Sequence, residues 1–325
     1  MVAAAAVVGA EAGAVVVEAN SLPDCCRVWE YSWRLDMQKD RVGLGWRPEL
    51  ALGIFKHLDQ IDILEVIGND YLGASQGDAL RLLARQVPLH IHGIDLGMAG
   101  SEDVNSKRLD RLARLINQVQ PEAWSEHLAF VRSGAVEIGH LAAPPRTEAS
   151  VENTNRNLRK AARIVGCLPL MENIATLLQP PCSSLSEQQW ISQIAAASDC
   201  GLLLDLHNVY ANATNFSFDP EQFLAEIPIE KVGCIHIAGG RWISSPDGSQ
   251  QYLLDDHLHE VTEPVYALLS EVAAQANQPL TVILERDGEY PPMEALLQEL
   301  QRTRAAITAG RQRRLELEKV TADAI

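Results

Sequence analysis

The stretch GLLLDLHNVY, residues 201–210, begins like a buried β-strand and ends in polar residues. Residues 202–204 are all leucine, and apolar runs of this kind are typical of strands buried on both faces of a parallel sheet. Asp205, His207 and Asn208 follow at once. A carboxylate and an imidazole at the end of a core strand need partners, because burying them alone costs free energy. The same change from apolar to polar recurs along the chain.

Eight short apolar runs alternate with helical patterns. This alternation predicts βαβ units in a parallel sheet, and eight units are the number that closes a (β/α)8 barrel. A doubly wound open sheet favours a G-x-G-x-x-G turn after its first strand, which GLGWRPEL (43–50) lacks. The predicted strands are residues 42–46, 63–68, 88–93, 123–128, 168–173, the start of 201–210, 232–239 and 280–286. The predicted helices are residues 49–58, 78–87, 106–119, 151–166, 186–198, 219–227, 263–276 and 293–320, the last broken near Gly310, and loops are expected after the fourth and seventh strands.

We expect three parts along the chain, with the barrel in residues 41–292. The apolar run near the start is interrupted by Glu11 and Glu18, and no Lys or Arg precedes it, so it does not resemble a signal peptide. We expect residues 1–40 to form a flexible extension. Residues 293–325 are expected to form a helix that packs on the barrel or extends from it. No window has the roughly 20 apolar residues of a membrane helix.

Charge and cysteine content restrict the class of protein. The formal net charge of −16 disfavours a nucleic-acid partner, because phosphate binding depends on Lys and Arg. The six cysteines contain no C-x-x-C pair, and several lie in apolar runs, where a reduced cysteine behaves as a small hydrophobe. We therefore expect a soluble protein of a reducing cytoplasm, with neither a nucleic acid nor a membrane as its partner.

Side chains that bind metals gather at the carboxyl ends of the predicted strands, here called the rim. In a (β/α)8 barrel these ends converge on one mouth, where the chemistry takes place. Of the nine histidines, only His57 and His140 fall outside the rim. The rim residues, in strand order from the third strand, are His90 and His92, Glu126 and His127, Glu172 and Asn173, Asp205 with His207 and Asn208, His236 with Asp255, His257 and His259 in the loop that follows, and Glu285 with Asp287.

Taken together, these side chains predict a metal site. One histidine at a strand end is more often a satisfied polar residue than a ligand, and Asp255 and Asp256 also fit solvated loop acids. Mixed imidazoles and carboxylates without cysteine suit iron or manganese, with zinc as an alternative. The candidates exceed the roughly six ligands of one octahedral ion, so we expect two or three ions, with Glu172 and Glu285 as bridging carboxylates.

Strand geometry predicts which neighbouring residues enter the mouth. His90 and His92 are two apart and face the same way, so one is expected to bind metal while the other lies deeper. Glu126 and His127 point to opposite faces, so we expect only His127 to enter the mouth.

At these positions the sequence resembles the multinuclear non-heme iron-dependent oxidative enzymes, a family that includes the iron oxidase of methanobactin biosynthesis. The matching motifs occur in the order of the family and cover residues 42–291. They are HIHGIDLGMAGS (90–101), SEHLAF (125–130), LMENIATLL (170–178), GLLLDLHNVYANATN (201–215), IHIAGG (235–240), the D-x-H of LLDDHLHEV (253–261) and ILERDGEYP (283–291).

The resemblance implies a xylose isomerase-like barrel with two or three iron ions, in the Fe2+ and Fe3+ states. It also implies O2-dependent oxidation of a cysteine in a ribosomally synthesised precursor peptide, with a small partner protein that presents the leader peptide. The implied metal ligands are His92, His127, Glu172, Asp205, His236, Asp255, His257 and Glu285, of which Glu172, Asp205 and Glu285 are the candidate catalytic residues. His90, Asn173, Asn208 and Asp287 are candidates for orienting those ligands.

Two departures and two alternatives accompany this interpretation. Many bacterial members carry a histidine where this chain has Leu50, and many end the seventh-strand motif in histidine where it has Gly240. We expect both departures to affect the substrate and partner more than the iron.

A divalent-metal isomerase, phosphodiesterase or other hydrolase shares the predicted barrel. Sugar isomerases usually need a catalytic Lys or His beside their metals, and no Lys lies on the rim. A non-catalytic metal-binding scaffold would have every coordination position filled.

Overall fold

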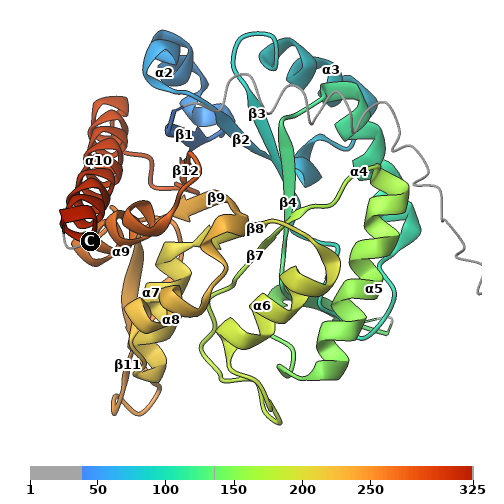
Figure 1. Cartoon of the computed structure of the whole chain (residues 1–325). Coiled ribbons are helices and arrows are strands. Elements are labelled where there is room, and N and C mark those ends of the chain that lie inside the picture. Colours follow the sequence, from blue (N-terminus) through green and yellow to red (C-terminus); the bar gives the residue numbers. More distant parts are fainter. Residues whose placement is uncertain (1–38, 135, 324–325) are drawn as a thin grey trace, which may run out of the picture.

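The computed structural model describes residues 39–134 and 136–323, and in them eight parallel strands close into a barrel surrounded by helices (Figure 1). The strand order around the barrel is β1-β12-β9-β8-β7-β4-β3-β2, so each barrel strand lies beside the next one along the chain. The predicted (β/α)8 barrel is confirmed. Its strands are β1 (Arg41–Gly45), β2 (Leu64–Ile67), β3 (Leu89–His92), β4 (Ala123–His127), β7 (Leu170–Glu172), β8 (Leu202–Asp205), β9 (Val232–Ile237) and β12 (Thr281–Leu284).

The helices follow the strands, and side-chain caps define several of their starts. Ser186 accepts a hydrogen bond from the backbone N–H of Gln189, and Asp219 caps the helix that begins at Pro220. The helices are α2 (Ala51–Lys56), α3 (Ala74–Leu83), α4 (Ser106–Val119), α5 (Glu148–Val165), α6 (Glu187–Ser198), α7 (Leu206–Phe216), α8 (Pro220–Glu226), α9 (Glu263–Gln275) and α10 (Met293–Asp323).

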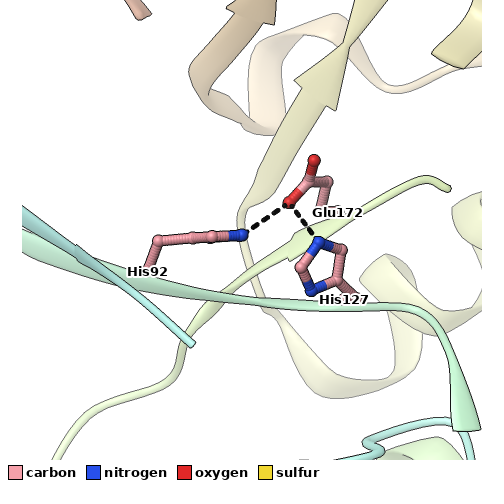
Figure 2. Close-up of side chains that lie close together, drawn as sticks. All are labelled: His92, His127 and Glu172. Atoms are coloured by element: carbon pink, nitrogen blue, oxygen red, sulfur yellow. Dashed lines mark ion pairs between the residues drawn. The ribbon is translucent and has the colours of Figure 1, made fainter. Parts of the chain in front are cut away.

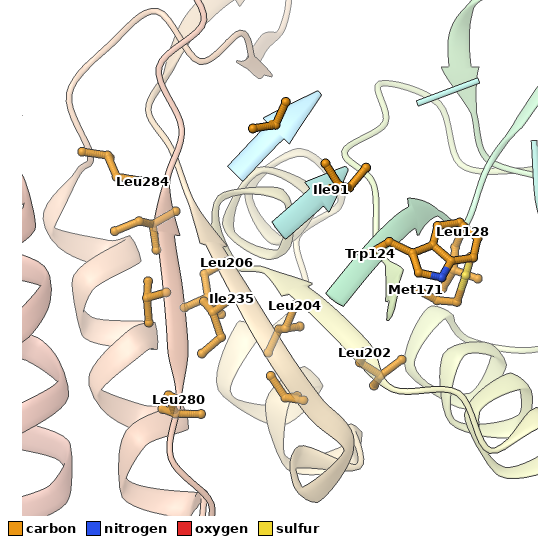
Figure 3. Packing of buried hydrophobic residues seen from close by; sticks show 14 of the residues in the cluster. Ile91, Trp124, Leu128, Met171, Leu202, Leu204, Leu206, Ile235, Leu280 and Leu284 are labelled. Carbon is orange, nitrogen blue, oxygen red and sulfur yellow. The ribbon is translucent and has the colours of Figure 1, made fainter. Parts of the chain in front are cut away.

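Alternate residues of several strands belong to two separate apolar clusters. Leu202 and Leu204 of β8 belong to the large cluster between the strands and the helices, part of which Figure 3 shows. Leu203, which points to the opposite face, belongs to a small cluster contributed only by strands and their edges. This second cluster, the aliphatic layer, consists of Ile63, Leu170, Leu203, Cys234 and Ile283.

Three elements differ from the sequence prediction. The loops expected after the fourth and seventh strands contain antiparallel hairpins, β5 (Phe130–Ser133) with β6 (Val136–Ala142) and β10 (Gly240–Ser244) with β11 (Gln251–Asp255). The third is α7, which begins directly after β8, because the Asp205 carboxylate accepts a hydrogen bond from the Asn208 N–H at 2.7 Å and caps the new helix.

The predicted break near Gly310 is wrong, because α10 is continuous from Met293 to Asp323. The glycine instead permits close packing of α10 against α9, which lie side by side (Figure 1). A Cβ atom at position 310 would lie 2.2 Å from the carbonyl oxygen of Ser270 and 2.7 Å from the Cβ of Ala273.

The expectation for residues 1–40 falls outside the described residues except at Lys39 and Asp40. The Asp40 carboxylate accepts hydrogen bonds from Arg311 of α10 and from the backbone N–H of Leu280. Within residues 39–134 and 136–323, no helix combines the length and apolar character that crossing a membrane requires.

Replacing Gly310 by leucine should force α9 and α10 apart. We expect the Gly310→Leu variant to lose about 2 kcal/mol of unfolding free energy, as overpacked sites do, measured by denaturant titration. Ala309→Leu, at an exposed position of the same helix, is the control and should change stability little. Equal stability of the two variants would show that the contact at Gly310 is not tight.

Candidate metal centre

A two-residue repeat places polar side chains directly above the aliphatic layer. Side chains two apart in a strand share a face, and each member of the aliphatic layer is followed two residues later by a carboxylate or an imidazole. Glu172 follows Leu170, Asp205 follows Leu203, and the remaining pairs obey the same rule. The resulting polar layer consists of Glu65, Glu172, Asp205, His236 and Glu285, all buried.

The first group of candidate ligands joins β3, β4 and β7. The Nε2 atoms of His92 and His127 lie 3.4 and 3.3 Å from the same oxygen of Glu172, Oε2 (Figure 2). Because the two imidazoles approach one carboxylate oxygen from different strands, their nitrogens and that oxygen lie within 4.8 Å of one another and are suited to one metal ion.

His236 links this group to the far side of the rim. Its Nδ1 lies 3.4 Å from Oε1 of Glu172 and 3.0 Å from Oε2 of Glu285. Asp205 joins it, since ligand atoms of Glu172, Asp205 and His236 also lie within 4.8 Å of one another. The two oxygens of Glu172 therefore face different imidazoles, which is the arrangement a bridging carboxylate needs.

The third group includes residues from the segment after the seventh strand. Ligand atoms of Asp205, His257 and Glu285 lie within 4.8 Å of one another. Asp255, the last residue of β11, places Oδ1 2.8 Å from Nε2 of His257. His257 has a left-handed backbone (φ 55°), an uncommon conformation in which histidine is enriched. Its backbone N–H donates to the carbonyl of Gly239 at 3.1 Å and its carbonyl accepts from the N–H of Asp287 at 2.9 Å. Asp287 also orients the ring, because its Oδ2 lies 2.9 Å from His257 Nδ1.

Many buried polar atoms of this cluster have no hydrogen-bond partner among the described residues. Native proteins satisfy nearly all such atoms, so this concentration calls for ligands. These oxygen and nitrogen atoms can all coordinate a metal ion. The atoms are Glu172 Oε2, Asp205 Oδ2, Asn208 Oδ1, His236 Nδ1, Asp255 Oδ1, His257 Nε2 and Glu285 Oε2.

Two buried residues that hold the imidazoles were absent from the sequence prediction. Glu65 Oε2 lies 2.7 Å from Nε2 of His236, so its carboxylate orients that ring with Nδ1 toward the rim. The Ser125 hydroxyl lies 2.7 Å from ring nitrogens of both His90 and His92. The position of Glu65 two residues after Ile63 was the available signal, because it repeats the pattern of the other strands.

The remaining predicted residues divide into those near the cluster and those turned away. His90 lies deeper than His92, 3.8 Å from Glu65. Glu126 faces away from the mouth, and its carboxylate accepts hydrogen bonds from the backbone N–H groups of Leu96 and His127. A fourth group of possible ligand atoms within 4.8 Å of one another joins Glu65, His236 and Glu285. His259 pairs with Asp256 and belongs to none of the four groups.

Asn173 and Asn208 tie the ends of β7 and β8 together. Asn173 donates to the carbonyl of Asp205 and accepts from its N–H, both at 2.9 Å. Asn208 donates to the carbonyl of Asn173 at 3.0 Å. These bonds fix the side of the rim that carries Glu172 and Asp205.

Burial and mutual charge shift the pKa values of the cluster strongly. Burial, followed by the neighbouring Asp255, raises the pKa of Asp205 well above its ordinary value. Burial opposes protonation of His236, but Glu285 and Glu65 outweigh it and raise the pKa of His236 well above its usual range. Burial also lowers the pKa of His92 well below its ordinary value. Strongly shifted groups of this kind concentrate at functional sites.

A cavity of about 480 Å³ opens onto the cluster. His92, His127, Asp255 and His257 line it at the rim. Its outer walls come from both hairpins and from the loop after β7, and they are largely aliphatic, with Ile67, Ile94, Val131, Leu141, Leu177, Leu253 and Leu254. The cluster is therefore accessible to a ligand.

Comparison with known proteins matches this geometry to a family and a fold. The family described as the RiPP precursor modification enzyme MbnB/TglH/ChrH matches residues 41–308. A UPF0276 protein of Bordetella bronchiseptica is 30% identical over 272 residues, which cover 83% of this chain and 93% of that protein. A UPF0276 protein of Streptomyces avermitilis is 33% identical over 267 residues, 80% of this chain but only 53% of that protein, so the chain spans about half of this relative.

Solved structures show the same barrel at low sequence identity. The IOLI protein with a bound zinc atom has a TM-score of 0.53 at 13% identity, covering 82% of this chain and 97% of that one. A xylose isomerase domain protein from Planctomyces limnophilus has a TM-score of 0.52 at 12% identity, covering 86% and 99%. These structures establish a xylose isomerase-like barrel, and the family match confirms the resemblance of the motifs. The chain belongs to the MbnB/TglH/ChrH family of RiPP precursor modification enzymes.

Proposed function

We propose that the chain is an O2-dependent oxidase that modifies a cysteine of a ribosomally synthesised precursor peptide, using two or three iron ions held at the rim. The observation that carries the proposal is the convergence of eight imidazoles and carboxylates, many with unpartnered buried atoms, beside one cavity. Membership of the family supports a precursor peptide as the substrate. The donor set supports iron, since mixed imidazole and carboxylate ligands suit iron or manganese.

Different groups of side chains would bind different ions. His92, His127 and one oxygen of Glu172 would hold one ion, while the other oxygen of Glu172 faces His236 and would hold the next. Asp205, His257 and Glu285 complete the far side. Bound iron would supply thiolate binding and O2 activation. The aliphatic walls of the cavity would exclude water around the cysteine.

The cavity and the family separate this proposal from the alternatives. A scaffold with filled coordination would not need an open space beside His92, His127 and His257, yet all three line the cavity. A sugar isomerase would need a lysine or further histidine for catalysis. No lysine lines the cavity within the described residues, but His140 of β6 does, so membership of the precursor-modification family, and not the cavity wall, disfavours the isomerase. The small partner protein that presents a leader peptide stays a prediction.

Removing one ligand should reduce bound metal without unfolding the barrel. We expect His92→Ala and Glu172→Ala each to lower the iron content of anaerobically reconstituted protein, measured by elemental analysis and Mössbauer spectroscopy. Circular dichroism should show an intact fold. A variant that keeps its full iron content would show that the residue is not a ligand, and less than one iron per wild-type chain would contradict the proposed function.

The catalytic part of the proposal is tested with O2 and a peptide. Protein loaded with iron should consume O2 only when a cysteine-containing precursor peptide encoded near its gene is present, and mass spectrometry should locate the mass change on the cysteine. A serine-for-cysteine peptide is the control. Oxidation of both peptides, or of neither, would contradict cysteine as the reacting residue.

Glu65 should tune the metal site through His236. We expect Glu65→Gln to weaken metal binding about 10- to 100-fold, as loss of a group that orients a ligand does, measured by competition with a chelator. Glu126→Gln is the matched control, because this carboxylate is equally buried but faces away from the mouth. Equal affinities of the two variants would assign Glu65 a purely structural role.

Metal binding should release protons and depend on pH. Binding requires neutral imidazoles and ionised carboxylates, whereas the pKa values of His236 and Asp205 are both raised. A raised histidine pKa stabilises the fold fully below about pH 6.5, its unfolded value, and this contribution is lost as the pH rises through the folded value.

We therefore expect the metal-free Tm to fall as the pH rises above about 6.5, while metal affinity increases. Thermal scans and calorimetry in buffers of different ionisation enthalpy measure the two effects. A metal affinity that is constant from pH 6 to 8, with no protons released, would contradict the assignment of His236 as a ligand that must lose a proton before it binds metal.

A further inference from the structure

His207 is a buried rim histidine that the ligand groups above leave out. It lies in the first turn of α7, is fully buried, and neither of its ring nitrogens has a hydrogen-bond partner among the described residues. Burying an imidazole without a partner is costly. A histidine in this state therefore points to a partner that the polypeptide does not supply.

The ring faces a candidate metal ligand. Nε2 of His207 lies 3.7 Å from Oδ1 of Asp255, and that oxygen lies 2.8 Å from Nε2 of His257. Asp255 and His257 form an ion pair, whereas neither ring nitrogen of His207 has a hydrogen-bond partner among the described residues. Two ligands of one ion, each about 2.1 Å from it, are about 3 to 4.2 Å apart, and the spacing of His207 and Asp255 falls in that range.

Gly240 provides the space for this ring. In the β10–β11 hairpin Gly240 pairs with Asp255, and a Cβ atom at position 240 would lie 2.5 Å from Nε2 of His207 and 3.0 Å from its Cε1. Any other residue at this position would displace the imidazole from Asp255. The absence of a side chain at Gly240 thus allows Nε2 of His207 to approach Asp255 of the hairpin.

We propose that His207 is a metal ligand that shares an ion with Asp255. It adds an imidazole to the eight ligands carried by the motifs, and it rests on the proposed function only in requiring that the rim binds metal.

Metal titration of the full chain tests the proposal without any peptide or O2. Metal-free wild type, His207→Leu and His259→Leu are titrated anaerobically with Fe(II), and separately with Co(II), whose visible spectrum reports its ligands. His207→Leu should bind one ion at least tenfold more weakly and should change the Co(II) spectrum. His259→Leu should match the wild type, because His259 is half exposed and pairs with Asp256.

Thermal unfolding distinguishes a ligand from a structural histidine. Replacing an unpartnered buried imidazole by leucine should leave the Tm of the metal-free protein unchanged or higher, and should reduce only the rise in Tm that metal produces. Equal losses of Tm with and without metal would overturn the proposal. His207→Gln provides the same comparison if the leucine variant does not fold.

The outcomes separate this proposal from the proposed function. Wild-type stoichiometry, affinities and Co(II) spectrum in His207→Leu would overturn the role of His207 while leaving peptide oxidation untouched. A weakened ion in His207→Leu together with a wild-type protein that oxidises no peptide would support His207 and overturn the oxidase. A wild type that binds neither metal would overturn both.

Discussion

The structure depends on one constraint, which is that buried carboxylates and imidazoles must find partners. In the polar layer, five such side chains occupy the barrel interior above an aliphatic layer, where water and protein donors are scarce. Burying one uncompensated charge is expensive, and several like charges together are more so. Burial raises the pKa of Asp205, and Glu285 and Glu65 raise that of His236, so the groups of this cluster act strongly on one another. Bound cations would satisfy these oxygens and nitrogens together.

The alternation of strand side chains builds this arrangement. On β8, Leu202 and Leu204 pack under the helices, while Leu203 and Asp205 point into the barrel. The same two-residue step carries Cys234 to His236 on the neighbouring strand. Five of the eight strands (β2, β7, β8, β9 and β12), together with the residues directly at their ends, therefore each contribute one apolar side chain to the aliphatic layer and one polar side chain to the polar layer above it.

The sequence predicted the parts of the site that obey strand periodicity and missed those that depend on packing. The repeated change from apolar to polar at strand ends identified His92, Glu172 and Glu285, because parallel strands in a barrel must end at one mouth. Glu65 was overlooked, since an acid inside a short strand also fits a solvated edge. No local sequence pattern distinguishes a glycine that breaks a helix from one that lets a second helix pack closely. The contact of Gly310 with α9 could therefore not be predicted from the sequence.

The two hairpins add to the barrel the segments that shape this site. A barrel fold alone does not determine a reaction, because function depends on the residues of the site. Here β10 and β11 bring Asp255 against the rim, and a glycine in that hairpin leaves space for His207. The segment after the seventh strand therefore supplies both candidate ligands and part of the cavity wall. A change in this hairpin would alter the access to the rim and the set of side chains at the rim together.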